Sequence, residues 1–462
     1  MKLVREGGLA QILKCCLYED LEVKRDSVFA LANIADSVEF QQDIVREGGI
    51  EVLVDVGGAD DARVQRDASR ALANLATAED IKGAIISKDG LKTLFKLARS
   101  LDVASQRYAT LALCNLSASG ETKARIIEQG AVRPLMFLAR FPDVEIQRYA
   151  ALALGGLALG DHGDNKVRMV EEGVVRPLVD MARFPDVEIQ RCACLALNAV
   201  ALGKHEVTKT SIMQEEGLLP LLALAGSSDL ECIRSAIYCL GSLAESDEVK
   251  SKLVEIGAVV TVVAQGRNDD MQIKRNCGYF LALMAEDAEF HDDLVREGGL
   301  ETLIELASLE DIESQEYAAF SLAHLASNRD YQVLMVDKGC LRPLVSMMSV
   351  HAEPRHYAGL ALLKLADNFN NHIKIAEEGG IQALLRLARA RSTDEELQYK
   401  AALTVGNLAS NAVKLLPRRG QGPDGSFGAA AATASAATVK KSKEATTGYL
   451  DRSVQDTAGG GK

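Results

Sequence analysis

At 462 residues, the chain is long enough for two or three ordinary domains. Its residues are 48% hydrophobic, but only 5% are aromatic and none is tryptophan, which is typical of stacked leucine- and alanine-rich helices rather than of a large aromatic core. The formal net charge of −13 leaves no surplus of lysine and arginine to neutralise phosphates, so nucleic acid is excluded as the expected partner.

From its first residues the chain carries a turn signal, V-x-E-G-G, which begins at residues 4–8 and recurs with variations. A second block, A-L-x-N-L-A, keeps the same period and first appears at residues 30–35 and 71–76. Two markers that share one period indicate internal repeats. The last glycine of the turn signal recurs every 40 to 44 residues, at Gly8, Gly49, Gly90, Gly130, Gly173, Gly217, Gly257, Gly299, Gly339 and Gly380.

Each period predicts three helices. A short first helix runs into the glycine, as at 41–49, a second follows it, as at 91–98, and a longer third carries the block, as at 64–76. We expect the glycine to take the left-handed conformation that ends the first helix. In the links at 141–143 and 184–186, both Phe-Pro-Asp, proline stops one helix and aspartate can cap the next.

About ten such units occupy residues 1–416, with predicted ends near residues 40, 80, 120, 163, 206, 248, 290, 330, 370 and 416. No unit is large enough to bury its own apolar face, so we expect the units to stack into one array. Residues 417–462 are rich in glycine, alanine, serine, threonine and lysine, and this composition predicts a disordered tail.

This three-helix unit resembles the armadillo repeat, and its cadence is most similar to the vacuolar armadillo scaffold group. The resemblance implies an all-α, right-handed α-solenoid and a non-enzymatic scaffold that holds extended or helical segments of partner proteins in its concave groove. That group is anchored to membranes by N-terminal acylation, whereas the second residue here is Lys2 rather than glycine. We therefore expect membrane contact only through a partner or through a missing N-terminal segment.

In armadillo families the third helices line the concave groove, and an asparagine on each can pair with both polar groups of a peptide bond. The alternative is that each asparagine only ties its own helix to the next. Tryptophans four residues earlier, which importin-α proteins use to hold basic side chains, are absent. By this alignment the predicted partner-binding residues are Asn33, Asn74, Asn115, Tyr108, Leu111, Tyr149, Leu152, Tyr238, Tyr279, Tyr317, Phe320 and Asn407.

In the middle of this surface Gly156, Ala199 and Ser242 replace asparagine. We expect these small residues to leave room for an amphipathic helix, or else to form a shallow apolar stretch without a ligand. Eight residues before the asparagine position, the first seven repeats carry an arginine, and Glu316 breaks the series in the eighth. These arginines either clamp acidic side chains of a partner or form ion pairs between repeats. The acidic composition favours the ion pairs. These arginines are Arg25, Arg66, Arg107, Arg148, Arg191, Arg234 and Arg275.

Nothing in the sequence indicates catalysis, a metal site or a cofactor. The seven histidines show no ligand spacing, and no nucleotide-binding or nucleophile motif is present. The nine cysteines fall mostly at apolar helical positions, typical of a reducing compartment. We therefore expect a cytoplasmic protein, peripheral to an endomembrane if the group resemblance holds. Two other functions stay open: a self-associating cytoskeletal or axonemal armadillo protein, and a regulatory part of a larger enzyme such as a ubiquitin ligase.

Overall fold

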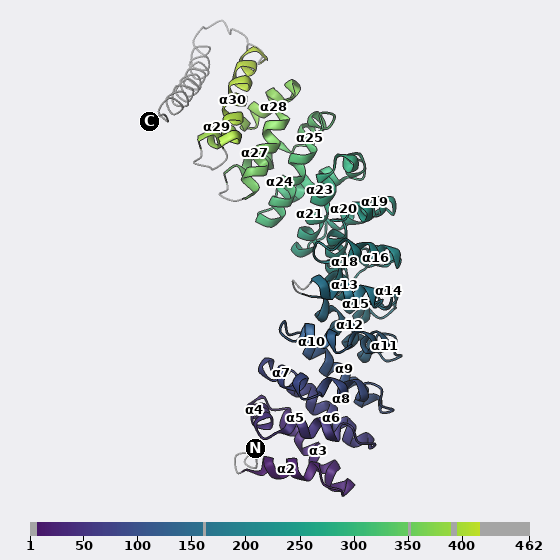
Figure 1. The fold of residues 1–462 in the computed structure, drawn as a ribbon. Coiled ribbons are helices and arrows are strands. Elements are labelled where there is room, and N and C mark those ends of the chain that lie inside the picture. The colour runs from purple at the N-terminus through teal and green to yellow at the C-terminus, as the bar shows by residue number, and fades with distance from the viewer. Residues whose placement is uncertain (1–6, 160–162, 350–352, 390–394, 416–462) are drawn as a thin grey trace, which may run out of the picture. The chain divides into compact units, whose positions relative to one another are not determined.

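The computed structural model describes residues 7–159, 163–349, 353–389 and 395–415. Every regular element in these ranges is a helix, which confirms the predicted all-α fold. The contacts divide the chain into two units, Met1–Ile256 and Gly257–Lys462. Each unit is a stack of three-helix repeats, an α-solenoid, as the labels of Figure 1 allow the reader to follow in chain order. The predicted tail at 417–462 lies outside the described residues.

Each repeat after the first contributes a first, a second and a third helix, and the first repeat contributes its second and third within the described residues. Where the sequence predicted helix bounds, they agree to within a few residues. The first helices are α4 (Val38–Arg46), α7 (Glu79–Ser87), α10 (Lys123–Glu128), α13 (Gly163–Glu171), α16 (Glu206–Gln214) and α19 (Asp247–Glu255) in the first unit, and α22 (His291–Arg296), α25 (Gln332–Asp337) and α28 (His372–Glu377) in the second. Short 3-10 turns, η1 (Ala288–Phe290) and η2 (Phe369–Asn371), precede α22 and α28.

The second helices are α2 (Gly8–Cys16), α5 (Gly49–Val56), α8 (Gly90–Leu97), α11 (Val132–Leu138), α14 (Val175–Ala182) and α17 (Leu218–Ala225), followed in the second unit by α20 (Ala258–Gln265), α23 (Gly299–Ala307), α26 (Leu341–Met347) and α29 (Gly380–Arg389). The third helices are α3 (Leu21–Ala35), α6 (Ala62–Leu75), α9 (Val103–Ser117), α12 (Val144–Ala158), α15 (Val187–Ala201) and α18 (Leu230–Leu243), followed by α21 (Met271–Glu286), α24 (Ile312–Leu325), α27 (Glu353–Leu365) and α30 (Glu395–Leu415).

Within each unit, consecutive third helices lie side by side and form the spine of the stack. The third helices α3 to α27 carry a buried leucine at one register position, for example Leu72, Leu113 and Leu154, and α30 carries the buried Val405 there. Because these side chains meet the adjacent repeats as well as their own second helix, the core continues from one repeat to the next within the unit. This arrangement confirms that stacking supplies the hydrophobic core.

The predicted left-handed conformation of the recurring glycine is confirmed at Gly130, Gly173, Gly257 and Gly339. Where two glycines stand together in the turn between first and second helices, the structure corrects the prediction. In the Gly48–Gly49 pair the first glycine has the positive φ, 79°, whereas the second begins α5. A Cβ on Gly49 would lie 2.4 Å from Ile44 Cγ2 and 2.7 Å from the Ile44 carbonyl oxygen. The first glycine therefore supplies the left-handed conformation, and the second lets α5 start against the end of α4.

Two repeats make the same turn without glycine at the left-handed position. Asp89 has a φ of 60° and Glu216 a φ of 59°. A side chain in this conformation places Cβ too close to the following carbonyl oxygen, which costs about 1 kcal/mol or more. These two turns are therefore held by the stacking of their neighbours rather than by local preference.

We predict that Asp89→Gly raises the free energy of unfolding by about 1 kcal/mol, because it removes this backbone strain. The substitution also removes the ion pair between Lys92 Nζ and Asp89 Oδ1, which are 2.8 Å apart. This pair is largely exposed, so it contributes little to the free energy of unfolding. Thermal melts followed by circular dichroism would measure the change. Asp89→Ala is the matched control, since it removes the same carboxylate but keeps Cβ, and equal melting temperatures for the two variants would contradict the strain argument.

Candidate functional site

The solvent-facing side of the third helices, here named the third-helix face, carries the residues predicted to bind a partner. The first three asparagines lie on α3, α6 and α9, each partly exposed, and each forms a hydrogen bond to the preceding or following repeat. Asn33 Oδ1 accepts from Arg70 at 2.8 Å, and Asn115 Nδ2 donates to the Ala73 carbonyl oxygen at 3.1 Å. Asn74 Nδ2 donates to Asp36.

These bonds support the second interpretation of the asparagines, in which each ties its helix to a neighbour. Each amide still has hydrogen-bonding capacity left, because an amide offers two N–H groups and two lone pairs. Contact with a partner stays a prediction for Asn33, Asn74 and Asn115. Asn407 lies exposed on α30 in the second unit.

Beyond the asparagines, the third-helix face of the first unit becomes apolar. Leu152 on α12, Leu195 on α15 and Tyr238 on α18 occupy one register position in three consecutive repeats, and they are 37%, 49% and 38% exposed. We call these three residues the apolar strip. The same face carries the predicted residues Tyr108, Leu111 and Tyr149, each partly buried.

The small residues beside the strip do not leave the room expected from the sequence. A Cβ on Gly156 would lie 2.8 Å from Ser117 Oγ of α9, and Ala199 and Ser242 are buried. The neighbouring third helix fills the space that the missing side chains would have occupied. The expectation of a roomier surface at these positions is therefore wrong: small residues here allow close helix packing.

In the second unit, aromatic rings lie on the third-helix face. The Tyr279 and Tyr317 ring centroids are 5.8 Å apart, and those of Phe320 and Tyr357 are 5.1 Å apart in an edge-to-face arrangement. His324 lies against Phe320 at 4.4 Å, and burial lowers its pKa. The predicted residues Tyr279, Tyr317 and Phe320 therefore form part of one aromatic row across α21, α24 and α27.

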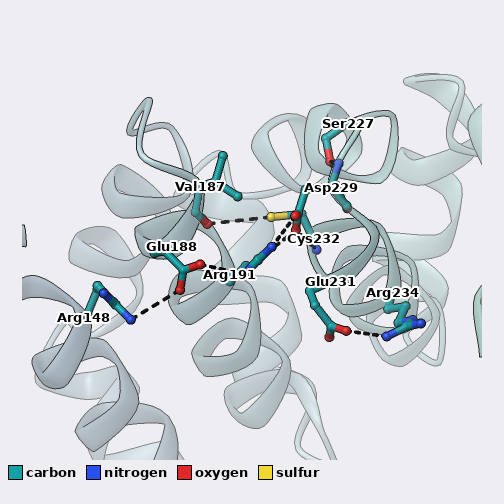
Figure 2. A network of polar contacts seen from close by, with 9 residues as sticks. All are labelled: Arg148, Val187, Glu188, Arg191, Ser227, Asp229, Glu231, Cys232 and Arg234. Carbon is teal, nitrogen blue, oxygen red and sulfur yellow. Dashed lines mark hydrogen bonds and ion pairs between the residues drawn. The ribbon is translucent and has the colours of Figure 1, made fainter.

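The arginines next to this face join each repeat to the following one. Arg191 on α15 lies between Glu188 of its own helix and Asp229, which caps α18 (Figure 2). Asp229 also accepts a hydrogen bond from the Cys232 backbone N–H, so one carboxylate both caps a helix and binds the preceding repeat. The corresponding pairs are Arg25–Asp61, Arg66–Asp102, Arg107–Asp143 and Arg275–Asp311, whereas Arg148 contacts Glu188.

The structure thus confirms the inter-repeat interpretation of the arginine series for these six members. Hydrogen bonding to Arg25 lowers the pKa of Asp61 to about 2, and Arg275 lowers the pKa of Asp311 to about 2. Arg191 likewise lowers the pKa of Asp229 well below its usual range. The sequence pattern had left the acceptor unidentified, because the capping aspartate lies 36 to 38 residues further along the chain.

Burial raises the pKa of the Cys16 thiol to about 12, far from the value of a reactive thiolate. Among the described residues, no three histidine, cysteine or acidic side chains gather where they could hold a metal ion. No helix in the described ranges is long and apolar enough to cross a membrane.

Comparison with known proteins agrees with the repeat architecture. The model of the armadillo/beta-catenin-like repeat matches residues 37–77, 121–159 and 371–410. A crystal structure of an engineered protein is 31% identical, covers 87% of this chain and 98% of its own, and has a TM-score of 0.79. A second engineered protein, also 31% identical, covers 52% of this chain and 97% of its own with a TM-score of 0.49. The search of curated proteins finds no match.

We predict that Asp61→Asn lowers the melting temperature by a few degrees at neutral pH and by much less at pH 2. Asparagine keeps the helix cap but loses the charge that pairs with Arg25. Because the pKa of Asp61 is about 2 in the folded protein, below its ordinary value of 3.8, its stabilisation is complete above the ordinary value and disappears as the pH falls through about 2. Melting curves of both proteins at several pH values would measure this, and a constant gap down to pH 2 would contradict it.

Proposed function

Because the chain belongs to the armadillo-repeat family, we propose that it is a non-enzymatic scaffold whose third-helix face binds segments of other proteins. The observation that supports this proposal most is the apolar strip. Leu152, Leu195 and Tyr238 stand in register on consecutive helices with more than a third of each side chain exposed. Exposed apolar side chains that are contiguous, rather than scattered singly, are typical of a binding surface.

The strip favours a helical segment over an extended one. An extended peptide needs partners for its own backbone groups, and the amides that would supply them, such as Asn74 and Asn115, already bond to neighbouring repeats. An amphipathic helix satisfies its backbone internally and needs only a surface that buries its apolar face. An extended segment would be restricted to the asparagine-bearing helices α3, α6 and α9.

The dimensions agree with this proposal. Packed helices lie about 8–10 Å apart, so the three intervals from α9 to α18 span roughly 24–30 Å. A helix of about 16–20 residues has the same length. A partner helix of ordinary size would therefore reach from Leu111 to Tyr238 across the first unit.

Two further parts of the proposal rest on the repeat cadence rather than on the geometry. The V-x-E-G-G and VQR-x-A-x-x-AL-x-NLA patterns resemble the vacuolar armadillo scaffold group. By that resemblance we propose a cytoplasmic protein that works at the surface of an endomembrane. A partner, or a segment preceding this sequence, would provide the contact with the membrane.

We predict that the double variant Leu195→Ser, Tyr238→Ser loses about tenfold or more in affinity for the partner, because apolar anchors in the centre of an interface contribute most of the binding energy. Its melting temperature should stay within about a degree, since both side chains are exposed. The partner is first captured from native extract with the unaltered protein, then purified and titrated against both.

The matched control is Val38→Ser, Phe137→Ser, which removes two exposed apolar side chains elsewhere in the first unit. It should bind as the unaltered protein does. Equal binding by all three proteins would refute the assignment to the strip. Loss of binding only in Asn74→Ala, Asn115→Ala would instead assign the partner to the asparagines in extended form.

A further inference from the structure

A cleft of about 630 Å³ lies on the first unit, away from the third-helix face, where the links between second and third helices of two consecutive repeats meet. One wall is the link before α6, with Asp60, together with the first turns of α6, with Gln65. The other wall is α8 with the link that follows it. None of the residues predicted to bind a partner lines it. The cleft is therefore a separate feature from the apolar strip.

The cleft exists because the link before α6 is built from small residues, Gly57 to Ala59. The position of Ala59 is taken by Phe141 and Phe184 in the fourth and fifth repeats, where a ring occupies the link. A Cβ on Gly57 would lie 2.7 Å from Thr93 Cγ2, so this glycine also lets α8 approach closely. The small side chain of Ala59 thus leaves the space of the cleft open. The missing side chain of Gly57 lets the link approach α8.

Bonds between the two repeats hold the walls in place. Gln65 donates to the Ala59 carbonyl oxygen at 2.7 Å and accepts from Ser100 Oγ at 2.6 Å. Lys96 Nζ donates to the Gly58 carbonyl oxygen at 2.6 Å. The cleft is preformed, and a ligand entering it would not have to order these segments.

Three cations line this wall of the cleft: Lys92, Lys96 and Arg99. Lys92 and Lys96 share one face of α8, and Arg99 lies in the link, two residues after the helix ends at Leu97. No other second helix in the described ranges, taken together with the link that follows it, carries cations at all three of these positions; in the preceding repeat they are Glu51, Asp55 and Gly58. Neither Lys96 nor Arg99 forms an ion pair with a described residue.

The opposing acidic charge is small. Asp102 is paired with Arg66 at 2.6 Å, and only Asp60 remains as an unpaired carboxylate among the lining residues. Lys92 is paired with Asp89, which lies outside the lining, in a largely exposed ion pair that a carboxylate of a ligand can replace. The apolar part consists of Phe95 in the lining and Leu101 at the rim, and the Leu101 side chain is completely exposed. A positive, partly apolar hollow on a chain of net charge −13 is complementary to acidic groups next to an apolar side chain.

We propose that this cleft binds a short acidic peptide segment of a partner protein, with one large apolar side chain against Phe95 and Leu101 and carboxylates against Lys92, Lys96 and Arg99. The site is independent of the third-helix face, so one molecule can hold two segments at once. Linking two such contacts raises the effective affinity for a partner that carries both. A flat anionic membrane surface fits a hollow less well than a peptide does.

The test uses a displayed library of random peptides of about 12 residues, selected on the full chain and counter-selected on Lys92→Glu, Arg99→Glu. Surviving peptides should be net acidic and contain a large apolar residue. Fluorescence anisotropy would measure the affinity of these peptides. We expect the affinity to fall about tenfold or more in Lys92→Glu, Arg99→Glu and several-fold in Leu101→Ser. Added salt should also lower the affinity for the unaltered protein. The control Arg342→Glu, Arg386→Glu makes the same charge change on second helices of the other unit and should stay within about twofold.

Several results would overturn the proposal: no surviving peptides, neutral or basic ones, or equal loss of binding in the control. Loss of binding in Leu195→Ser, Tyr238→Ser instead of in the cleft variants would place the peptide on the third-helix face. Vesicles of phosphatidylserine and phosphatidylcholine form a second arm. Binding to these vesicles through Lys92 and Arg99, without acidic-peptide binding, would assign the cleft to a lipid surface.

Discussion

The constraint on which the structure depends is that no repeat can bury its own apolar surface. Within each unit, consecutive third helices contact one another, and leucines such as Leu72 on α6 and Leu154 on α12 are completely buried. Five Arg–Asp pairs also fix the order of this stacking, since in each the arginine of one repeat meets the capping aspartate of the next, as Arg191 meets Asp229. Packing and ion pairing thus fix the same neighbour in the same register.

Because some side chains hold the repeats together and others do not, particular surfaces remain available for binding. The core leucines and the arginine series are committed to the stack, whereas Leu195 on the third-helix face and Leu101 at the rim of the cleft are exposed and buried by nothing in the described part of the chain. The polar side chains nearest the cleft, such as Lys96 and Gln65, hold its walls at fixed positions. A rigid repeat frame with exposed apolar positions is suited to recognition rather than to catalysis, which would need reactive groups such as an activated thiolate.

Much of the fold could be predicted from the sequence, because the repeat period and the residues that form the turns can be recognised within short stretches of the chain. The glycine spacing predicted the repeats, and the Asp-containing links predicted the helix starts, as Asp143 confirms by accepting from the Ile146 N–H. What escaped prediction depends on contacts between repeats. The lack of room at Gly156 depends on Ser117, which lies in the preceding repeat. His291, one of the scattered histidines, turns out to bond the Ala285 carbonyl oxygen at the end of α21, and the cleft required two links to be placed together.

The central claim is that the third-helix face of the first unit is the surface offered to a partner while the rest of each repeat maintains the stack. Hydrogen–deuterium exchange of the full chain, with and without its captured partner, tests this most directly. The account predicts new protection in α12, α15 and α18, with little change in the first helices α10, α13 and α16. Protection confined to those first helices, or no protection in either set, would contradict it.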